Sequence, residues 1–99
     1  IVFFDLPVTE KAAQKAATKF RNFLINDGYL MVQYSVYSRV CNGYDAVKTH
    51  EKRLKQHLPP NGSVRLLTIT EKQYESMQIL LGEYIQSDIP VAYEQLTLL

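Results

Sequence analysis

The residue with the clearest capacity for chemistry in this sequence is Asp5, which directly follows the apolar run Ile1-Val2-Phe3-Phe4. Four large apolar residues in succession predict a strand that is buried on both faces and central in its sheet. Pro7 lacks the N–H that a sheet ladder needs, so we expect the strand to end near it. Asp5 would then lie at the carboxyl end of a buried strand. A lone carboxylate there needs a helix N-terminus, a cation or a metal ion as its partner.

A second group of residues points to the binding of an anion. Lys11, Lys15 and Lys19 recur every four residues in a helical pattern, so they form one row of like charges. A phosphate backbone would relieve the repulsion between them. The charge is also divided, because residues 1–65 contain ten Lys and Arg against five Asp and Glu, whereas residues 66–99 contain one against five. This asymmetry favours two surfaces for two partners, and a solvated lysine face is the alternative. The candidate nucleic-acid contacts are Lys11, Lys15, Lys19, Arg21, Arg39, Lys48, Lys52 and Arg53.

Other residue types argue against several kinds of site. Cys41 is the only cysteine, which excludes an internal disulfide and a thiolate-cluster metal site, so we expect a reducing compartment, the cytoplasm. His50 and His57 lack a third ligand nearby, and we interpret them as partly exposed histidines rather than a zinc site. The sequence shows no apolar run long enough to span a bilayer and no secretory signal. Because the chain starts inside a strand without Met, we expect that a few residues precede it.

The elements that must position these residues alternate between helix and strand. Apolar residues recur at helical spacing from Thr9, a fair N-cap, to Asp27-Gly28, which predicts a helix over residues 9–27. Residues 29–40 are rich in Tyr and Val, so they are extended. They form either one strand with a bulge or two short strands joined by a tight turn.

The rest of the chain continues this alternation. The expected elements are a loop at 41–43, a helix from 44 or 45 to 57, a strand at 63–70, a short connection at 71–73, a strand at 77–81, a loop at 83–90 and an extended segment at 91–99. Such an order in a short chain favours an α+β fold, with helices on one face of an antiparallel sheet. Tyr34, Val36 and Tyr37 would offer a dimer surface on the other face.

Three motifs resemble a known family, in which they occur in the same order along the whole domain. They are Phe3-Phe4-Asp5-Leu6-Pro7, then Gln33-Tyr34-Ser35-Val36-Tyr37, then Gly62-Ser63-Val64-Arg65-Leu66-Leu67-Thr68-Ile69-Thr70-Glu71-Lys72-Gln73. The family is the small subunit of the CRISPR spacer-acquisition machinery, the second of its two near-universal proteins. The resemblance extends to about Gly82, and the Thr-Glu-Lys-Gln ending is most similar to members from systems with a single-protein effector nuclease.

The resemblance implies a ferredoxin-like β-α-β-β-α-β sandwich with one or two extra C-terminal strands, and therefore two strands between residues 29 and 40. It implies a core domain at 1–82 and a C-terminal loop and strand at 83–99 for partner docking. It also implies a symmetric homodimer in which a late strand, for which 77–81 is our candidate, extends the other protomer's sheet. Asp5 would lie near the dimer axis, where its two copies share one divalent cation, usually Mg²⁺.

One function implied by this resemblance is hydrolysis of RNA or DNA by a Mg²⁺-dependent endonuclease. Asp5 would be the catalytic and metal-binding residue, with Tyr37 a weaker catalytic candidate. Many members with nuclease behaviour have a basic residue shortly before the Val-Gln pair. Met31 occupies that position here, which argues against activity.

The function that we favour is a scaffold. The homodimer would bridge two dimers of the CRISPR integrase and bind the prespacer DNA duplex through its phosphates during spacer acquisition in antiviral defence. Residues 91–99, in the acidic C-terminal third, would dock the integrase, for which strand addition is one mode. A third class, a small-molecule-binding regulatory domain of the same fold, would need a polar pocket, and the sequence shows no Gly-rich or acid-rich loop to form one.

Overall fold

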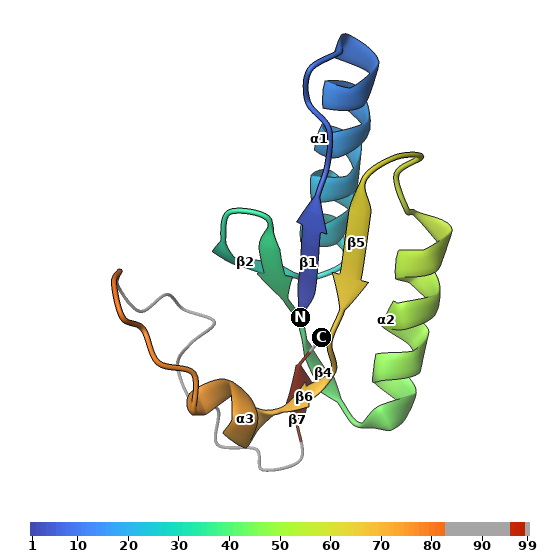
Figure 1. The fold of residues 1–99 in the computed structure, drawn as a ribbon. Coiled ribbons are helices and arrows are strands. Elements are labelled where there is room, and N and C mark those ends of the chain that lie inside the picture. Colours follow the sequence, from blue (N-terminus) through green and yellow to red (C-terminus); the bar gives the residue numbers. More distant parts are fainter. Residues whose placement is uncertain (83–95, 99) are drawn as a thin grey trace.

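Strand β1 (Val2–Asp5) occupies the middle of a four-stranded antiparallel sheet in the computed structural model, which describes residues 1–82 and 96–98. The strand order is β2-β3-β1-β5, with β2 at Leu30–Gln33, β3 at Val36–Ser38 and β5 at Ser63–Leu66 (Figure 1). Helices follow β1 and precede β5, so these elements run β-α-β-β-α-β along the chain. The expected ferredoxin-like α+β fold is confirmed.

The helices α1 (Lys11–Asn26) and α2 (Tyr44–Gln56) pack against one face of this sheet. Both predicted helices are confirmed. Their inward residues form one buried cluster with alternate residues of the strands: Val2, Phe4, Phe20, Leu24, Tyr29, Tyr37, Cys41, Val47 and Leu54. The expected N-cap Thr9 is wrong, because Glu10 is the cap residue, with extended backbone and no capping hydrogen bond from its side chain.

The ring of Phe4 joins the sheet to α1. Its centroid lies 5.3 Å from that of Phe20 in an edge-to-face contact and 5.6 Å from that of Tyr37 in a stacked one. Because side chains alternate along a strand, Phe3 and Asp5 point to the opposite face, where both are exposed. The prediction that this strand is buried on both faces is therefore wrong for the single chain.

Residues 30–38 form two strands, β2 and β3, as the family resemblance implied, and Val40 already belongs to the next strand. Tyr34 and Ser35 form the turn between β2 and β3, and Ser35 has a φ of 63°. The ladder also shifts register between Met31 and Gln33, so a bulge accompanies the turn. The expected dimer surface is partly wrong: Tyr34 is exposed and Val36 half-buried, but Tyr37 belongs to the core beneath the helices.

A second, three-stranded sheet has the order β4-β7-β6, with β4 at Val40–Asn42, β6 at Ile69–Thr70 and β7 at Leu96–Leu98. The loop predicted at 41–43 is therefore wrong at residues 41 and 42, which pair with β7. The single strand predicted at 63–70 is divided between the two sheets as β5 and β6. The described part of the expected docking segment lies between two strands of its own chain.

The short helix α3 (Glu71–Glu75) replaces the connection predicted at 71–73. The Thr70 side chain accepts a hydrogen bond from the Gln73 N–H, and the Gln73 side chain accepts one from the Thr70 N–H, which forms a capping box. The strand predicted at 77–81 is wrong for the single chain. Leu80 and Leu81 are 90% and 97% exposed and make no ladder.

The loop predicted at 83–90 and most of the extended segment predicted at 91–99 lie outside the described residues. Within the described part of the chain, none of the helices combines the length and the apolar content that crossing a bilayer requires.

Gly62 provides a test of how the end of β1 is held. It has a φ of +101°, and a Cβ atom there would lie 2.7 Å from the Asp5 carbonyl oxygen. We expect Gly62→Ala to lower the free energy of unfolding by about 2–4 kcal/mol, because strain and a backbone clash act together. Urea unfolding monitored by circular dichroism measures this loss.

Gly43→Ala is the matched control, because Gly43 has a φ of +93° but nothing lies within 4 Å of the position that a Cβ atom would take there. It should lose only the strain, about 1 kcal/mol. Equal losses for the two variants would show that Gly62 does not press on the end of β1.

Candidate functional site

Asp5 lies at the carboxyl end of β1, as predicted, but it is not desolvated. Its neighbour across the ladder is Ser63 on β5, and its side chain is on the exposed face of the sheet. The carboxylate therefore does not need a partner to offset burial. The expectation of a costly, buried carboxylate is wrong for the single chain, because β1 is covered by helices on one face only.

The residues around Asp5 do not form a metal site within one chain. Among residues 1–82 and 96–98, no three His, Cys, Asp or Glu residues come close enough together to hold an ion. Mg²⁺ prefers oxygen ligands in octahedral geometry, and Asp5 would be a lone carboxylate. By strand register, the nearest ionisable neighbour of Asp5 is the cationic Arg65, which lies two residues beyond Ser63 on β5.

Tyr37, the weaker catalytic candidate, is 4% exposed and stacks on Phe4. Cys41 is fully buried, and burial raises the pKa of its thiol, with the nearby Arg39 acting in the opposite direction. A raised pKa keeps the thiol protonated and unreactive at neutral pH. Neither residue is placed to meet a substrate in solution.

The lysine row of α1 (Lys11, Lys15 and Lys19) is exposed and lies along one groove. This groove, about 1400 Å³ in volume, runs between α1 and the C-terminal end of α2. At the α2 end, the Phe23 and His57 rings stack with centroids 4.0 Å apart. None of the three lysines forms an ion pair with a carboxylate of the described residues. The row therefore offers three free cations to an anionic ligand.

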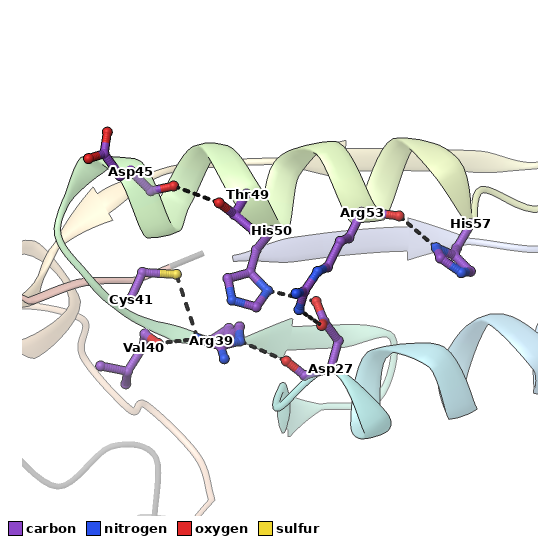
Figure 2. A network of polar contacts seen from close by, with 9 residues as sticks. All are labelled: Asp27, Arg39, Val40, Cys41, Asp45, Thr49, His50, Arg53 and His57. Atoms are coloured by element: carbon purple, nitrogen blue, oxygen red, sulfur yellow. Dashed lines mark hydrogen bonds and ion pairs between the residues drawn. The ribbon is translucent and has the colours of Figure 1, made fainter.

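The other predicted nucleic-acid contacts divide into free and engaged cations. Lys52 is exposed and has no ion pair among the described residues, whereas Lys48 Nζ lies 3.9 Å from Glu51. Arg21 is directed at the β2–β3 turn, where Nη2 donates to the Tyr34 hydroxyl at 3.1 Å and the guanidinium lies 5.2 Å from the Tyr34 ring centroid. Arg39 and Arg53 both converge on Asp27 (Figure 2).

Asp27, at the C-terminal end of α1, is the centre of this polar network. Its carboxylate accepts a hydrogen bond from Arg53 Nη1 at 2.9 Å and lies 2.7 Å from His50 Nδ1, so it ties α1 to α2 (Figure 2). Its backbone carbonyl accepts from Arg39 Nε at 2.7 Å, and Arg39 Nη1 donates to the Val40 carbonyl. Arg39 and Arg53 thus have structural partners that a nucleic acid would have to share.

Sequence reasoning did not identify Asp27 as more than a helix stop, and it described His50 as partly exposed. His50 is 7% exposed and faces Asp27, so that part of the interpretation is wrong, while His57 is exposed. The only signal for this network in the sequence was the spacing of its acidic and basic residues, and the paired residues lie up to 26 positions apart. Such a pairing becomes visible when the helices are packed.

The environment of Asp27 determines how its pKa is shifted. Burial by itself raises the pKa of this carboxyl, but hydrogen bonds from His50 and Arg53 and the positive charge of both side chains outweigh burial and hold the pKa below its usual value. A lowered pKa means that the ionised form stabilises the folded state.

We therefore expect Asp27→Asn to lower the free energy of unfolding at pH 7 by about 2 kcal/mol, a typical value for hydrogen bonds to a charged group. The contribution is complete above the unfolded pKa of about 3.9 and is lost as the pH falls through the lower folded value. Urea unfolding at pH 7 and pH 3 tests this. The difference between wild type and Asp27→Asn should shrink in acid, and Glu75→Gln, at the end of α3, is the surface control. A difference that is the same at both pH values would contradict the assignment.

Comparison with known proteins matches the sequence of this chain to a family. The family model described as "CRISPR associated protein Cas2" matches residues 1–77. The protein of Acidovorax ebreus named "CRISPR-associated endoribonuclease Cas2" is 58% identical over 82 residues, which cover 83% of this chain and 80% of that protein. Proteins of the same name from Ligilactobacillus salivarius and Campylobacter jejuni are 46% and 50% identical. The matches cover 87% and 83% of this chain, and 85% and 57% of those proteins.

Proposed function

The chain belongs to the CRISPR-associated Cas2 family, and from this premise we propose that it acts in spacer acquisition as a homodimeric scaffold. In this role the dimer binds a prespacer DNA duplex and bridges copies of the CRISPR integrase. The observation that carries the proposal is the free lysine row on α1, set along an open groove. A row of exposed lysines without carboxylate partners is suited to phosphates, whatever the base sequence.

The contrast between the groove and the Asp5 region supports a scaffold over an enzyme. Three lysines lie along one helix, and four residues of helix rise about 6 Å, so the row extends over about 12 Å of surface. Asp5 instead stands as one carboxylate without the cluster of ligands that a metal-dependent hydrolase needs, as far as the described residues extend. Arg39 and Arg53, engaged with Asp27, would add little to DNA binding.

The acidic C-terminal third is the candidate integrase surface. The residues that carry its charge beyond the described core are Glu83, Asp88 and Glu94. Leu96–Leu98 already pairs with β4 and β6 of its own chain, so docking of the integrase by strand addition would first have to free this strand. We therefore assign the docking to the negative charges.

Replacing the three lysines together (Lys11→Gln, Lys15→Gln and Lys19→Gln) tests the DNA-binding proposal. Each phosphate contact contributes about 0.9 to the slope of log affinity against log salt, so the slope should fall by about 3 and the affinity for duplex DNA should fall for all sequences. Fluorescence anisotropy over a salt series measures both quantities.

Lys72→Gln, on α3 away from the groove, is the control and should leave the slope within about 1 unit of the wild-type value. An unchanged slope for the triple variant would place the DNA surface elsewhere on the chain.

Hydrolysis is the second candidate function, and the names of the relatives, which call them endoribonucleases, favour it. Its active residue would be Asp5, which solvent reaches freely. If the physiological role is scaffolding, Asp5→Ala should keep most spacer integration in an assay reconstituted with integrase and prespacer DNA. Circular dichroism and gel filtration of the variant serve as controls for folding and assembly. Complete loss of integration by a folded, dimeric variant would refute the scaffold.

A further inference from the structure

Part of the sheet face opposite α1 and α2 has no cover within the described residues. Helix α3 reaches this face through Tyr74, which packs with Ile1, Val32, Val36 and Ile69. The remaining side chains of the face are set by strand register. Phe3 lies between Val36 on β3 and Arg65 on β5, and the next row out holds Asp5 opposite Ser63. Phe3, Asp5, Ser63 and Arg65 are all exposed.

Asp5 and Arg65 are diagonal neighbours on this face. Diagonal neighbours in an antiparallel pair have Cα atoms about 7–8 Å apart, which a long side chain can span. Neither residue forms an ion pair or a side-chain hydrogen bond with the described part of the chain. The other three arginines, in contrast, each have a partner: Arg21 has Tyr34, Arg39 has the Asp27 carbonyl, and Arg53 has the Asp27 carboxylate. The face thus presents one carboxylate and one guanidinium, adjacent and unpaired.

This pattern is self-complementary. In a two-fold interface the same patch meets itself, so the apolar Phe3 and half-buried Val36 of one chain would pack on the same apolar patch of the other, while each chain contributes one negative and one positive charge. Two copies of Asp5 alone would repel each other in such an interface. The two Arg65 guanidiniums would bring the net charge of the interface to zero without a metal ion.

We propose that Arg65 is the counter-charge of Asp5 when two copies of this chain pack these sheet faces together, so that the homodimer forms without a divalent cation. The inference rests on the homodimer of the proposed function. It also agrees with the lack of a Mg²⁺ ligand cluster among the described residues: strand register places Arg65 beside Asp5, and its guanidinium can supply the positive charge that a metal ion would otherwise supply. Closure of the interface removes water from the pair and strengthens the attraction.

Sedimentation equilibrium of the full chain in EDTA and in MgCl₂ tests this proposal. The wild-type dimer should have the same dissociation constant in both. Arg65→Gln should raise the dissociation constant in EDTA by about tenfold or more, because it leaves two Asp5 carboxylates facing each other in the interface. Adding Asp5→Asn to Arg65→Gln should restore much of the affinity by removing that repulsion.

Two further variants separate charge from shape. Arg65→Lys keeps the charge and should remain dimeric in EDTA even if Arg65→Gln proves unstable. Lys52→Gln removes one charge from α2, on the helical side of the sheet, and should not change the dissociation constant. Circular dichroism confirms that each variant is folded.

Several results would overturn the proposal. If EDTA dissociates the wild-type dimer, a metal ion is the counter-charge. If Arg65→Gln dimerises normally but loses DNA affinity, Arg65 serves a nucleic acid, and if Asp5→Asn fails to rescue Arg65→Gln, the two residues are not coupled. A wild-type chain that stays monomeric at all concentrations would remove the homodimer, and with it this inference, whereas the other results leave the homodimer intact.

Discussion

The contact of Phe4 with Phe20 and Tyr37 is the interaction on which the rest of the molecule depends. It fixes β1 in the middle of the sheet and holds α1 against it, with ring centroids 5.3 and 5.6 Å from Phe4. Because a strand alternates its side chains, this choice of inward residues also sends Phe3 and Asp5 to the other face. The position of the one carboxylate that suggested catalysis is therefore a consequence of core packing.

The fold engages some of the positively charged side chains in contacts within the chain and leaves others available. Arg39 and Arg53 bind Asp27 and so help to hold α1, β4 and α2 together, and Arg21 holds the β2–β3 turn. The lysine row on α1 and Arg65 on β5 have no ion pair within residues 1–82 and 96–98 and lie on opposite sides of the sheet. In the proposed function, one side binds a phosphate backbone and the other a second copy of the chain. A chain of formal net charge +1 could then bind an anionic partner on one surface without being basic throughout.

Prediction from sequence succeeded where a signal is local and periodic. Both long helices follow from apolar spacing and turn residues, and the family follows from three short motifs. The two strands β2 and β3 were implied by the family resemblance, because the residues alone left one strand or two open. Prediction failed where long-range contacts decide. Residues 41 and 42 are a strand because β7 pairs with them. Residues 77–81 have an apolar composition that predicts a strand, but they pair with no strand in the described part of the chain. Strand propensity is realised when a partner strand is present.

The sequence by itself determined the two long helices, the lysine row and the placement of Asp5 at the end of β1, because periodicity, helical spacing and a following proline are properties of neighbouring residues. The ferredoxin-like order followed from the family resemblance, since the residues alone left 29–40 as one strand or two. The tertiary structure alone decided that Asp5 is exposed, that Asp27 joins His50 and Arg53, and that Arg65 is the diagonal neighbour of Asp5. These relations join residues 23 to 60 positions apart. They depend on the register of β1 with β5 and on the packing of α1 against α2, which no local pattern specifies.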